Sequence, residues 1–401
     1  MTPAARLQAA IDVLTALETT AAPADRVLRE YFRARRYAGS KDRAAVAERV
    51  FDCFRHAGSY AWRMNEASPR ARVIASLLAE GADPADFFTG ASYAPAALTK
   101  EEAAALAAPP RDPPLHVEGE FPAFLEPELT KAFGADLFAE MAAMQPRAPV
   151  GIRVNTLRTA RETLVTALAS EGFEATPTPH AATGLRLDGA TTSKLSASGL
   201  FAAGHFEFQD EAAQICAALC DAKPGMRVLD YAAGAGGKAL ALAAAMNNKG
   251  EIVAHDIEAG RLAMIGPRAE RAGVSIIRTT TSLPPVQYDL VLLDAPCSGT
   301  GTWRRQPELR VRFTPERLAQ LVALQAKLIA DASRFVAPGG RLVYATCSVL
   351  PCENDEHIAA FLGTHPEFAP VPVSDRETFF HASPRRTQTD GFFTAVLRRS
   401  T

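Results

Sequence analysis

The apolar residues of the first 108 positions recur at the three- and four-residue spacing of an α-helix. Residues that share a helical face are Leu7, Ile11, Leu14 and Leu17, and later Val46, Val50 and Phe54. No alternating strand pattern interrupts them. The segment 109–114 then holds four prolines, which end any helix because proline lacks an amide hydrogen and restricts its predecessor. We therefore expect residues 1–117 to form an all-helical domain that ends in a proline-rich linker.

A mixed pattern follows over residues 118–204. The spacing predicts a helix over 125–144, a strand over 150–154, a helix over 161–171, and short extended pieces after it. This order of elements indicates a small α+β module between the helical region and the rest of the chain.

From residue 205 onward, strand-like apolar runs alternate with helical ones. The predicted strands cover 227–230, 251–256, 275–278, 288–294, 341–346 and 392–397, and the predicted helices cover 237–246, 261–272 and 315–336. This alternation favours βαβ units, so residues 205–401 should form an α/β domain with a mainly parallel sheet. In such folds ligands bind at the carboxyl ends of the strands, where Asp230, Asp256, Asp294 and Cys347 fall.

The composition of the chain limits the number of domains and the class of protein. The chain has 401 residues, of which 48% are hydrophobic, enough for two or three domains. Six cysteines are too few for a disulfide framework, and no apolar run approaches the roughly 20 residues of a membrane helix. No secretory leader pattern opens the chain. We expect a cytoplasmic protein that is a monomer, without a membrane partner or a metal.

The net charge of -2 gives no sign of a nucleic-acid partner, but the cations are clustered. Between Arg26 and Arg55 lie nine basic residues against four acidic ones. A solvated helix face and an RNA-binding surface explain that cluster equally well. A second group, Arg304, Arg305, Arg310 and Arg312, closely follows Cys297, and we expect it to be functional.

A glycine-rich loop after the first strand of the α/β domain predicts a nucleotide site. Its small residues allow a nucleotide to approach the backbone before a helix begins; they are Ala232, Ala233, Gly234, Ala235, Gly236 and Gly237, followed by Lys238. Asp256 stands 20 residues after Gly236, where a carboxylate can accept hydrogen bonds from ribose hydroxyls. The pattern alone does not separate NAD from S-adenosylmethionine.

Two cysteines, Cys297 and Cys347, each follow a predicted strand and narrow the chemistry. Carbon 5 of cytosine can accept a methyl group only after a nucleophile has added to carbon 6, and a thiolate suits that addition. The addition pushes electron density toward ring nitrogen 3, where Asp294 can donate a proton or hold a hydrogen bond. A nicotinamide-dependent oxidoreductase would not need this pair of thiols.

The motifs together resemble the Nop/Sun family of RNA cytosine-5 methyltransferases, nearest its RsmB-like branch. The resemblance covers about 120–401 and rests on residues 153–157, 206–214, 230–238, 294–301, 304–307, 344–348, 353–355 and 390–393. It implies a Rossmann-like class I methyltransferase domain that uses S-adenosylmethionine and acts on RNA. It also implies that the module at 118–204 positions the RNA.

The resemblance also assigns roles to residues. It makes Cys347 the nucleophile, gives Cys297 the breakdown of the covalent intermediate, and places Lys238 in the active site. Spacing by itself leaves open which of the two thiols attacks. A free thiol has a pKa near 8.5, so a cation such as Lys238 is needed nearby to favour the thiolate.

Two positions depart from the family pattern. Gly234 and Ala235 stand where the family usually has alanine and proline, and residues 278–282 lack the aspartate that binds the adenine amino group. Thr280 is the best remaining adenine contact, through one neutral hydrogen bond. We expect these changes to weaken cofactor binding, which motivates an alternative: a non-catalytic RNA-binding ribosome-assembly factor.

The first domain resembles the NusB-like, RNA-binding extension of the same branch, mainly over residues 33–55. Arg35, Arg36 and Arg43 are the RNA contacts that we expect there. The branch resemblance favours ribosomal RNA as substrate, with transfer RNA as the alternative. The remaining paired cysteines, Cys216 and Cys220, fit buried packing better than a zinc site, because no histidine or second cysteine pair lies nearby.

Overall fold

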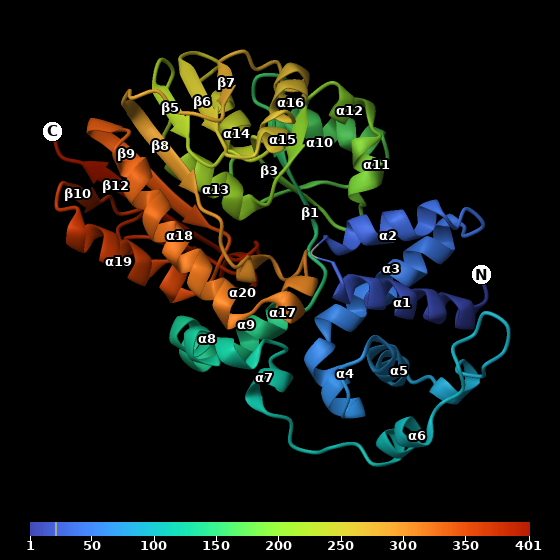
Figure 1. The fold of residues 1–401 in the computed structure, drawn as a ribbon. Helices are drawn as coiled ribbons and strands as arrows, with labels where there is room; N and C mark the ends of the chain where they lie inside the picture. The colour runs from blue at the N-terminus through green and yellow to red at the C-terminus, as the bar shows by residue number, and fades with distance from the viewer. Residues whose placement is uncertain (21) are drawn as a thin grey trace. The chain divides into compact units, whose positions relative to one another are not determined.

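The computed structural model describes residues 1–20 and 22–401 (Figure 1). These residues form two compact units. The first contains residues 1–146 together with 303–314, and the second contains residues 147–302 together with 315–401. A segment from the later part of the chain therefore belongs to the first unit.

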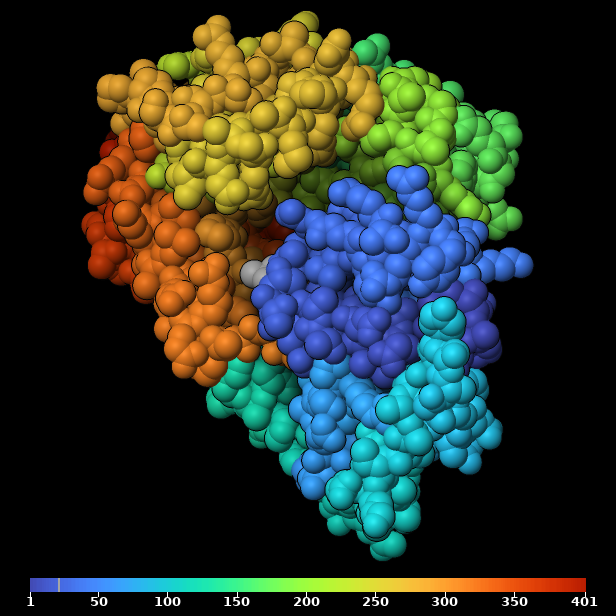
Figure 2. Space-filling model, turned by 45° about the vertical axis from the view of Figure 1, so that its right-hand side comes forward, coloured from blue at the N-terminus to red at the C-terminus, as the bar shows by residue number. Residues whose placement is uncertain are grey.

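The first unit is helical, as the spacing predicts. Its helices are α1 (Pro3–Glu18), α2 (Ala24–Arg33), α3 (Ser40–Arg55), α4 (Ala57–Met64), α5 (Pro69–Ala79), α6 (Lys100–Ala107), α7 (Leu115–Glu118), α8 (Glu126–Phe133), α9 (Leu137–Ala143) and α17 (Glu308–Arg312), with short 3-10 turns η1 (Pro84–Asp86), η2 (Ala123–Leu125) and η3 (Gly134–Asp136). Leu14, Val46, Val50 and Ile74 lie in its buried core. The stretch between α5 and α7, coloured cyan, runs along the outside of these helices (Figure 2).

Local sequence explains where several of these helices begin. The hydroxyl of Thr2 accepts a hydrogen bond from the Ala5 amide and Pro3 takes the first helical position of α1. Ser68 and Pro69 repeat the arrangement at α5. The expectation of one helix over 125–144 is wrong: Gly134, at φ +53°, separates α8 from α9, because glycine readily takes a backbone conformation that ends a helix.

The segment 303–314 shows that two arginines expected near the chemistry serve the first unit instead. Arg310 is buried; it donates hydrogen bonds to the carbonyl oxygens of Arg55 and Met144 and lies over the ring of Trp303. Arg312 donates to the carbonyl oxygens of Leu17 and Ala22. Buried guanidinium groups satisfy main-chain acceptors here, so the expectation is wrong for Arg310 and Arg312.

The second unit begins with a four-stranded antiparallel sheet of order β2-β3-β1-β4. Its strands are β1 (Val150–Val154), β2 (Thr176–Pro177), β3 (Gly184–Leu187) and β4 (Phe206–Phe208), joined by α10 (Arg161–Ser170), α11 (Thr192–Ser196) and α12 (Gly199–Ala202). Ile152, Leu164 and Leu185 pack in one buried cluster between sheet and helix. The predicted α+β module is present.

The larger sheet of this unit has the order β10-β12-β9-β8-β5-β6-β7, with β11 paired to β12. The strands are β5 (Arg227–Asp230), β6 (Glu251–His255), β7 (Ile277–Thr280), β8 (Tyr288–Asp294), β9 (Val336–Thr346), β10 (Phe368–Pro370), β11 (Phe380–Ala382) and β12 (Phe392–Arg399). Strands β5 to β9 pair in parallel, whereas β12 runs antiparallel to β9. The mainly parallel sheet is thus confirmed.

Helices cover both faces of this sheet, because successive strand residues point to opposite sides. Val228 packs in a cluster with α13 (Glu211–Leu219), α14 (Gly237–Ala245) and α16 (Ile265–Ala272), whereas Leu229 packs with α18 (Pro315–Ser333) and α19 (Asp355–Thr364). Figure 1 shows α18 and α19 together beside β9 and β12. The short helices α15 (Ala259–Leu262) and α20 (Pro384–Thr387) and the turns η4 (Thr300–Thr302) and η5 (Pro351–Glu353) complete the unit. This is a Rossmann-like, doubly wound α/β fold.

Within the described ranges, we find no helix with both the length and the apolar character of a membrane span.

Candidate active site

Two thiols meet at the carboxyl ends of β8 and β9. These strands pair in parallel with Asp294 opposite Ala345, so the segments that leave them start side by side. Cys297 and Cys347 are both half-buried there, and their sulfur atoms lie 3.4 Å apart. The structure therefore brings together two residues that are 50 positions apart in the sequence.

The environment favours the protonated form of one thiol. The hydrogen bond with Cys347, burial and repulsion from the Cys347 sulfur raise the pKa of Cys297 well above its ordinary value. A protonated Cys297 can donate its hydrogen to the Cys347 sulfur. Either sulfur of the pair can be the donor in this contact.

A partly buried ion pair stands at the same edge of the sheet. The Nζ atom of Lys238 lies 2.6 Å from Oδ2 of Asp294, and the Lys238 side chain is 11% exposed. Burial lowers the pKa of Lys238, but Asp294, with help from Cys216 and Asp230, more than offsets that effect and raises it. Lys238 also lies 5.1 Å from the centre of the Phe392 ring. These contacts keep the Lys238 side chain away from solvent.

Hydrogen bonds tie the two cysteine segments together. The buried carboxylate of Glu353 accepts from the amide and hydroxyl of Ser298, at 2.9 and 2.5 Å, and from Gln325 at 3.0 Å. The hydroxyl groups of Ser298 and Ser348 lie 3.1 Å apart. Asn354 donates to the Ser348 carbonyl oxygen and accepts from Thr346. Residues 353 and 354, noted in the sequence only as part of a motif, therefore hold the segments that carry the thiols.

The glycine loop between β5 and α14 has the backbone that its sequence predicts. Gly234 and Gly236 have φ angles of +54° and +79°, which other residues rarely adopt. A Cβ atom on Gly236 would lie 2.8 Å from Ile265, and one on Gly234 would lie 2.4 Å from Arg261. Only glycine fits at these two positions without a shift of the neighbours.

Side chains from outside the loop hold its backbone by hydrogen bonds. Asp256 accepts a hydrogen bond from the Gly234 amide at 2.9 Å, and Arg268 donates to the Ala235 carbonyl oxygen. Arg153, from the small sheet, donates to the Gly237 carbonyl oxygen at 2.9 Å and also contacts Gln209. Burial lowers the pKa of Arg153 to about 10, so it stays charged near neutral pH. Sequence reasoning missed the contribution of Arg153, although it falls in one of the matched motifs.

The residues predicted to hold the nucleoside lie close together, and some of their hydrogen-bonding atoms already have partners within the protein. Asp256 is buried, and its second oxygen accepts from the Glu258 amide at 2.9 Å. Thr280 pairs with His255 across β6 and β7, and its hydroxyl donates to the Ser282 carbonyl oxygen at 2.6 Å. The same hydroxyl accepts from the Ser282 amide at 3.1 Å, which leaves one lone pair for the hydrogen bond that we expect it to accept from adenine. The lone pairs of Asp256 can also accept further hydrogen bonds.

Two further residues at this edge had no role assigned from the sequence, where Asp230 was noted only as a strand-end residue and Ile257 was not noted. Asp230 is 1% exposed, and neither of its carboxylate oxygens meets the distance and angle limits of a hydrogen bond to another described residue. Burial and repulsion from Asp294 raise the pKa of Asp230 to about 7. Ile257 directly follows Asp256 and is 86% exposed, an unusual state for an isoleucine. An orphaned acid and an exposed apolar side chain beside a glycine loop fit a ligand with a cationic group and a flat ring.

The other cysteines of this unit have a structural role. Cys216 and Cys220 are buried in one core cluster, and the Cys220 thiol donates to the Cys216 carbonyl oxygen at 3.3 Å. Among the described residues, no group of three or more His, Cys, Asp or Glu side chains could hold a metal ion.

Comparison with known proteins agrees with this geometry. The family model for "16S rRNA methyltransferase RsmB/F" matches residues 217–398, and the model for the RsmF/B-like "ferredoxin-like domain" matches residues 121–193. A probable ribosomal RNA small subunit methyltransferase B of Bacillus subtilis is 31% identical over 307 residues, which cover 71% of this chain and 68% of that protein.

Two further relatives extend the comparison. Ribosomal RNA small subunit methyltransferase B of Thermus thermophilus is 40% identical over 208 residues, which cover 50% of this chain and 51% of that protein. The crystal structure of a protein named PH0851 covers 100% of this chain and 99% of its own, with a TM-score of 0.80 and 26% identity. Together these matches confirm the resemblance that the motifs indicate: the chain belongs to the RsmB/F family of S-adenosylmethionine-dependent RNA cytosine-5 methyltransferases.

Proposed function

We propose that this protein transfers a methyl group from S-adenosylmethionine to carbon 5 of a cytosine in the RNA of the small ribosomal subunit. The relatives from Bacillus subtilis and Thermus thermophilus are named as ribosomal RNA small subunit methyltransferases, which supports this substrate. The observation that carries the proposal is the 3.4 Å contact between the sulfur atoms of Cys297 and Cys347 at the edge that also holds Asp294 and Lys238.

The first step is the addition of the Cys347 sulfur to carbon 6 of the ring. Its electron pair forms the sulfur–carbon bond, the double bond between carbons 5 and 6 opens, and carbon 5 becomes nucleophilic. When bound, S-adenosylmethionine supplies the electrophilic methyl group that carbon 5 takes. Negative charge develops toward ring nitrogen 3 in this step. The Lys238 ammonium, 2.6 Å from Asp294, can pass a proton to the Asp294 carboxylate, which then donates it to that nitrogen.

The second step removes the proton from carbon 5 and frees the enzyme. The carbon–hydrogen electrons re-form the double bond, and the Cys347 sulfur leaves carbon 6 as a thiolate. The contact with the Cys347 sulfur is the largest cause of the high pKa of Cys297. Once Cys347 is bonded to the ring, that cause weakens, so Cys297 can lose its own proton to solvent and its thiolate can then take the proton from carbon 5. This change supports the division of roles that the family resemblance implies.

For the cofactor we propose the glycine loop, Asp256 and Thr280, joined by two residues that the structure adds. The loop backbone at Ala232, Ala233, Gly234, Ala235, Gly236 and Gly237 would approach the nucleoside, with Lys238 and Asp294 at its reacting end. Asp256 would accept from the ribose hydroxyls. Asp230 offers a carboxylate to a cationic group, and Ile257 offers an apolar side chain to one face of the adenine.

A covalent-trapping experiment tests the reaction. RNA that contains 5-azacytidine should form an adduct with the native protein that survives denaturing electrophoresis. Cys347→Ala should abolish the adduct, whereas Cys297→Ala should let one accumulate on ordinary RNA. Cys352→Ala serves as the matched control, because Cys352 lies close by in sequence and has no proposed role. The reverse pattern for Cys297 and Cys347 would show that their roles are exchanged.

Measured affinity for S-adenosylmethionine separates the enzyme from the alternative of a non-catalytic assembly factor. The hydrogen bonds that Asp256 and Arg268 make to the loop compensate for the missing proline and favour the enzyme. Methylation assays on ribosomal and transfer RNA then test the substrate. Action on ribosomal RNA would place the protein in the cytoplasm, and a monomer remains our prediction for its oligomeric state.

A further inference from the structure

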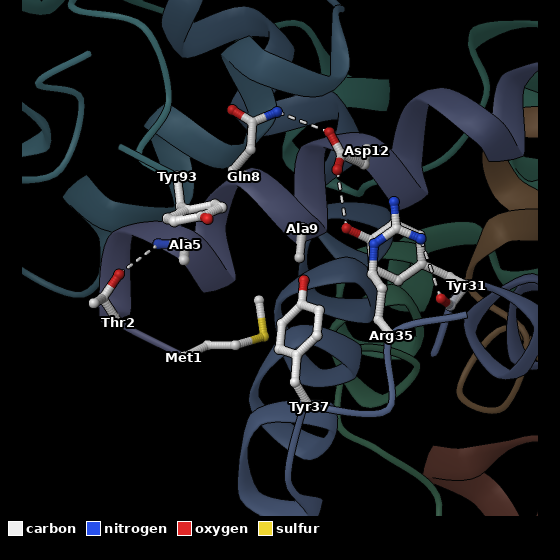
Figure 3. A pocket seen from close by; sticks show the side chains of 10 residues that line it. All are labelled: Met1, Thr2, Ala5, Gln8, Ala9, Asp12, Tyr31, Arg35, Tyr37 and Tyr93. Atoms are coloured by element: carbon white, nitrogen blue, oxygen red, sulfur yellow. Dashed lines mark hydrogen bonds between the residues drawn. The ribbon is translucent and has the colours of Figure 1, made fainter. Parts of the chain in front are cut away.

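The helical unit contains a pocket that the methyltransferase reaction does not use. It has a volume of about 580 Å³, within the range of small-molecule sites. It is an open pocket against α1, flanked by the loop between α2 and α3 and by the segment between α5 and α6 (Figure 3). The lining residues are Met1, Thr2, Ala5, Gln8, Ala9, Asp12, Tyr31, Arg35, Tyr37 and Tyr93.

Two tyrosines of this pocket are strongly exposed. Tyr37 is 73% exposed and Tyr93 is 84% exposed, and they approach α1 from separate segments of the chain (Figure 3). Exposed rings of this size lose the stabilisation that burial would give them. Two such rings at one pocket indicate a surface that a ligand covers.

The backbone conformation of Tyr93 also indicates that this surface has a function. Its φ angle is +64°, in the left-handed region that bulky residues rarely occupy and that glycine would occupy without strain. Such outliers concentrate at functional sites. Because the Tyr93 side chain is 84% exposed, packing of the ring within the protein does not explain why a tyrosine stands at this position.

The inner part of the pocket carries hydrogen-bonding groups that are already oriented. Asp12 accepts from the Tyr31 hydroxyl at 2.9 Å and from Gln8 at 2.7 Å, and its oxygens have lone pairs left for further donors. The Arg35 guanidinium lies 3.7 Å from the centre of the Tyr31 ring and donates to the Tyr31 carbonyl oxygen. A flat ligand with N–H donors on its edge fits these groups.

We propose that this pocket binds one unpaired base of the RNA substrate, stacked on Tyr37 and Tyr93 with its donor edge toward Asp12. This inference rests on the proposed function, because it takes the RNA substrate as the ligand. A carboxylate repels phosphate, so the base enters and the sugar–phosphate backbone stays outside. There the exposed Arg33, Arg36 and Arg43 provide the positive charge. Aromatic stacking accepts any base face, and this pairing of rings with cations is typical of single-strand binding sites.

The test measures the affinity of the full-length protein, without cofactor, for a short single-stranded RNA that carries one 2-aminopurine. This base loses fluorescence when it stacks on an aromatic ring. The double variant Tyr37→Ala, Tyr93→Ala should bind the RNA about 5- to 100-fold more weakly and lose the quenching. The double variant Tyr37→Phe, Tyr93→Phe keeps both rings and should bind like the native protein.

Two further variants separate stacking from general effects. Tyr93→Gly removes the ring and relieves the positive φ angle, so it should weaken RNA binding without lowering stability. Phe138→Ala removes another exposed aromatic side chain of the same unit and should leave binding unchanged. Loss of the rings should also leave the salt dependence of binding unchanged, because no phosphate contact is lost.

The inference is overturned if the alanine double variant binds RNA as tightly as the native protein, or if Phe138→Ala weakens binding by the same factor. A protein fragment or peptide as the true occupant would give the first of these results. The two proposals can fail separately. If the protein quenches 2-aminopurine but forms no 5-azacytidine adduct, only the proposed methyl transfer is refuted. An adduct with unchanged affinity in the alanine double variant refutes only the pocket.

Discussion

The thiol site of the α/β unit and the tyrosine pocket of the helical unit differ in how their functional side chains are held. At the thiol site, Lys238 is paired with Asp294, and hydrogen bonds from Glu353 fix the cysteine segments. In the pocket, the rings of Tyr37 and Tyr93 extend into solvent. A reacting atom must be placed within a fraction of an ångström, whereas a stacked base tolerates a looser platform.

Replacement of Cys347 should have the largest effect, and it should affect the thiol site alone. Without the sulfur nucleophile, we expect Cys347→Ala to lower the single-turnover methylation rate by about four orders of magnitude or more. RNA affinity should stay within about twofold, because the tyrosine pocket and the basic surface are unchanged. The measurements are methyl transfer from labelled cofactor and fluorescence titration of RNA. Normal methylation by the variant would refute the covalent mechanism.

Asp230 should make the stability of the native protein depend on pH. Its pKa in the folded state, about 7, lies above the ordinary value of 3.8, so the folded protein binds more protons between these values. Stability should therefore fall as pH rises from about 4 to about 7, by at most about 4 kcal/mol.

The variant Asp230→Asn cannot ionise there, so its stability should lack this fall. Urea unfolding at pH 5 and pH 8 checks the expectation, and the stability difference between variant and native protein should shift in favour of the variant at the higher pH. Parallel pH curves for the two proteins would contradict it.

Arg310 should matter for the stability of the helical unit and not for the chemistry. Arg310→Ala removes hydrogen bonds to two buried main-chain carbonyl groups, so we expect a loss of about 3 kcal/mol in the free energy of unfolding. The rate of methyl transfer by the folded fraction should stay unchanged. Urea unfolding with a parallel activity assay decides this. If Arg310→Ala is as stable as the native protein but has lost activity, Arg310 has the functional role that the sequence led us to expect.

Replacement of Arg36 should have the smallest effect. In contrast to Arg310→Ala, it should change RNA binding and leave stability nearly unchanged. Arg36 is exposed, so Arg36→Ala should change stability by less than about 0.5 kcal/mol. We expect weaker RNA binding at low salt and a slope of log affinity against log salt that is reduced by about one. Lys327→Ala, which removes another exposed cation in the α/β unit, provides the control. An unchanged slope would remove Arg36 from the RNA-binding surface.

The elements with a clear period were predictable from sequence alone. The strand over 150–154 and the alternation after residue 205 were found because side-chain periodicity reports local structure directly. The break at Gly134 was missed, since one glycine inside a helical pattern does not by itself predict a positive φ angle. The sequence placed Cys297 and Cys347 each after a strand, but the contact between their sulfur atoms came only from the structure.

The sequence by itself determined the fold class, the family and the strand-end position of the reacting residues, because all of these follow from local periodicity and short motifs. Only the tertiary structure decided which charges meet. It paired Lys238 with Asp294, buried Asp230 without a partner, turned Arg310 into a core residue, and brought Tyr37 and Tyr93 to one pocket. The physical reason is that burial and contact distance, which set pKa values and pairings, depend on residues far apart in the chain.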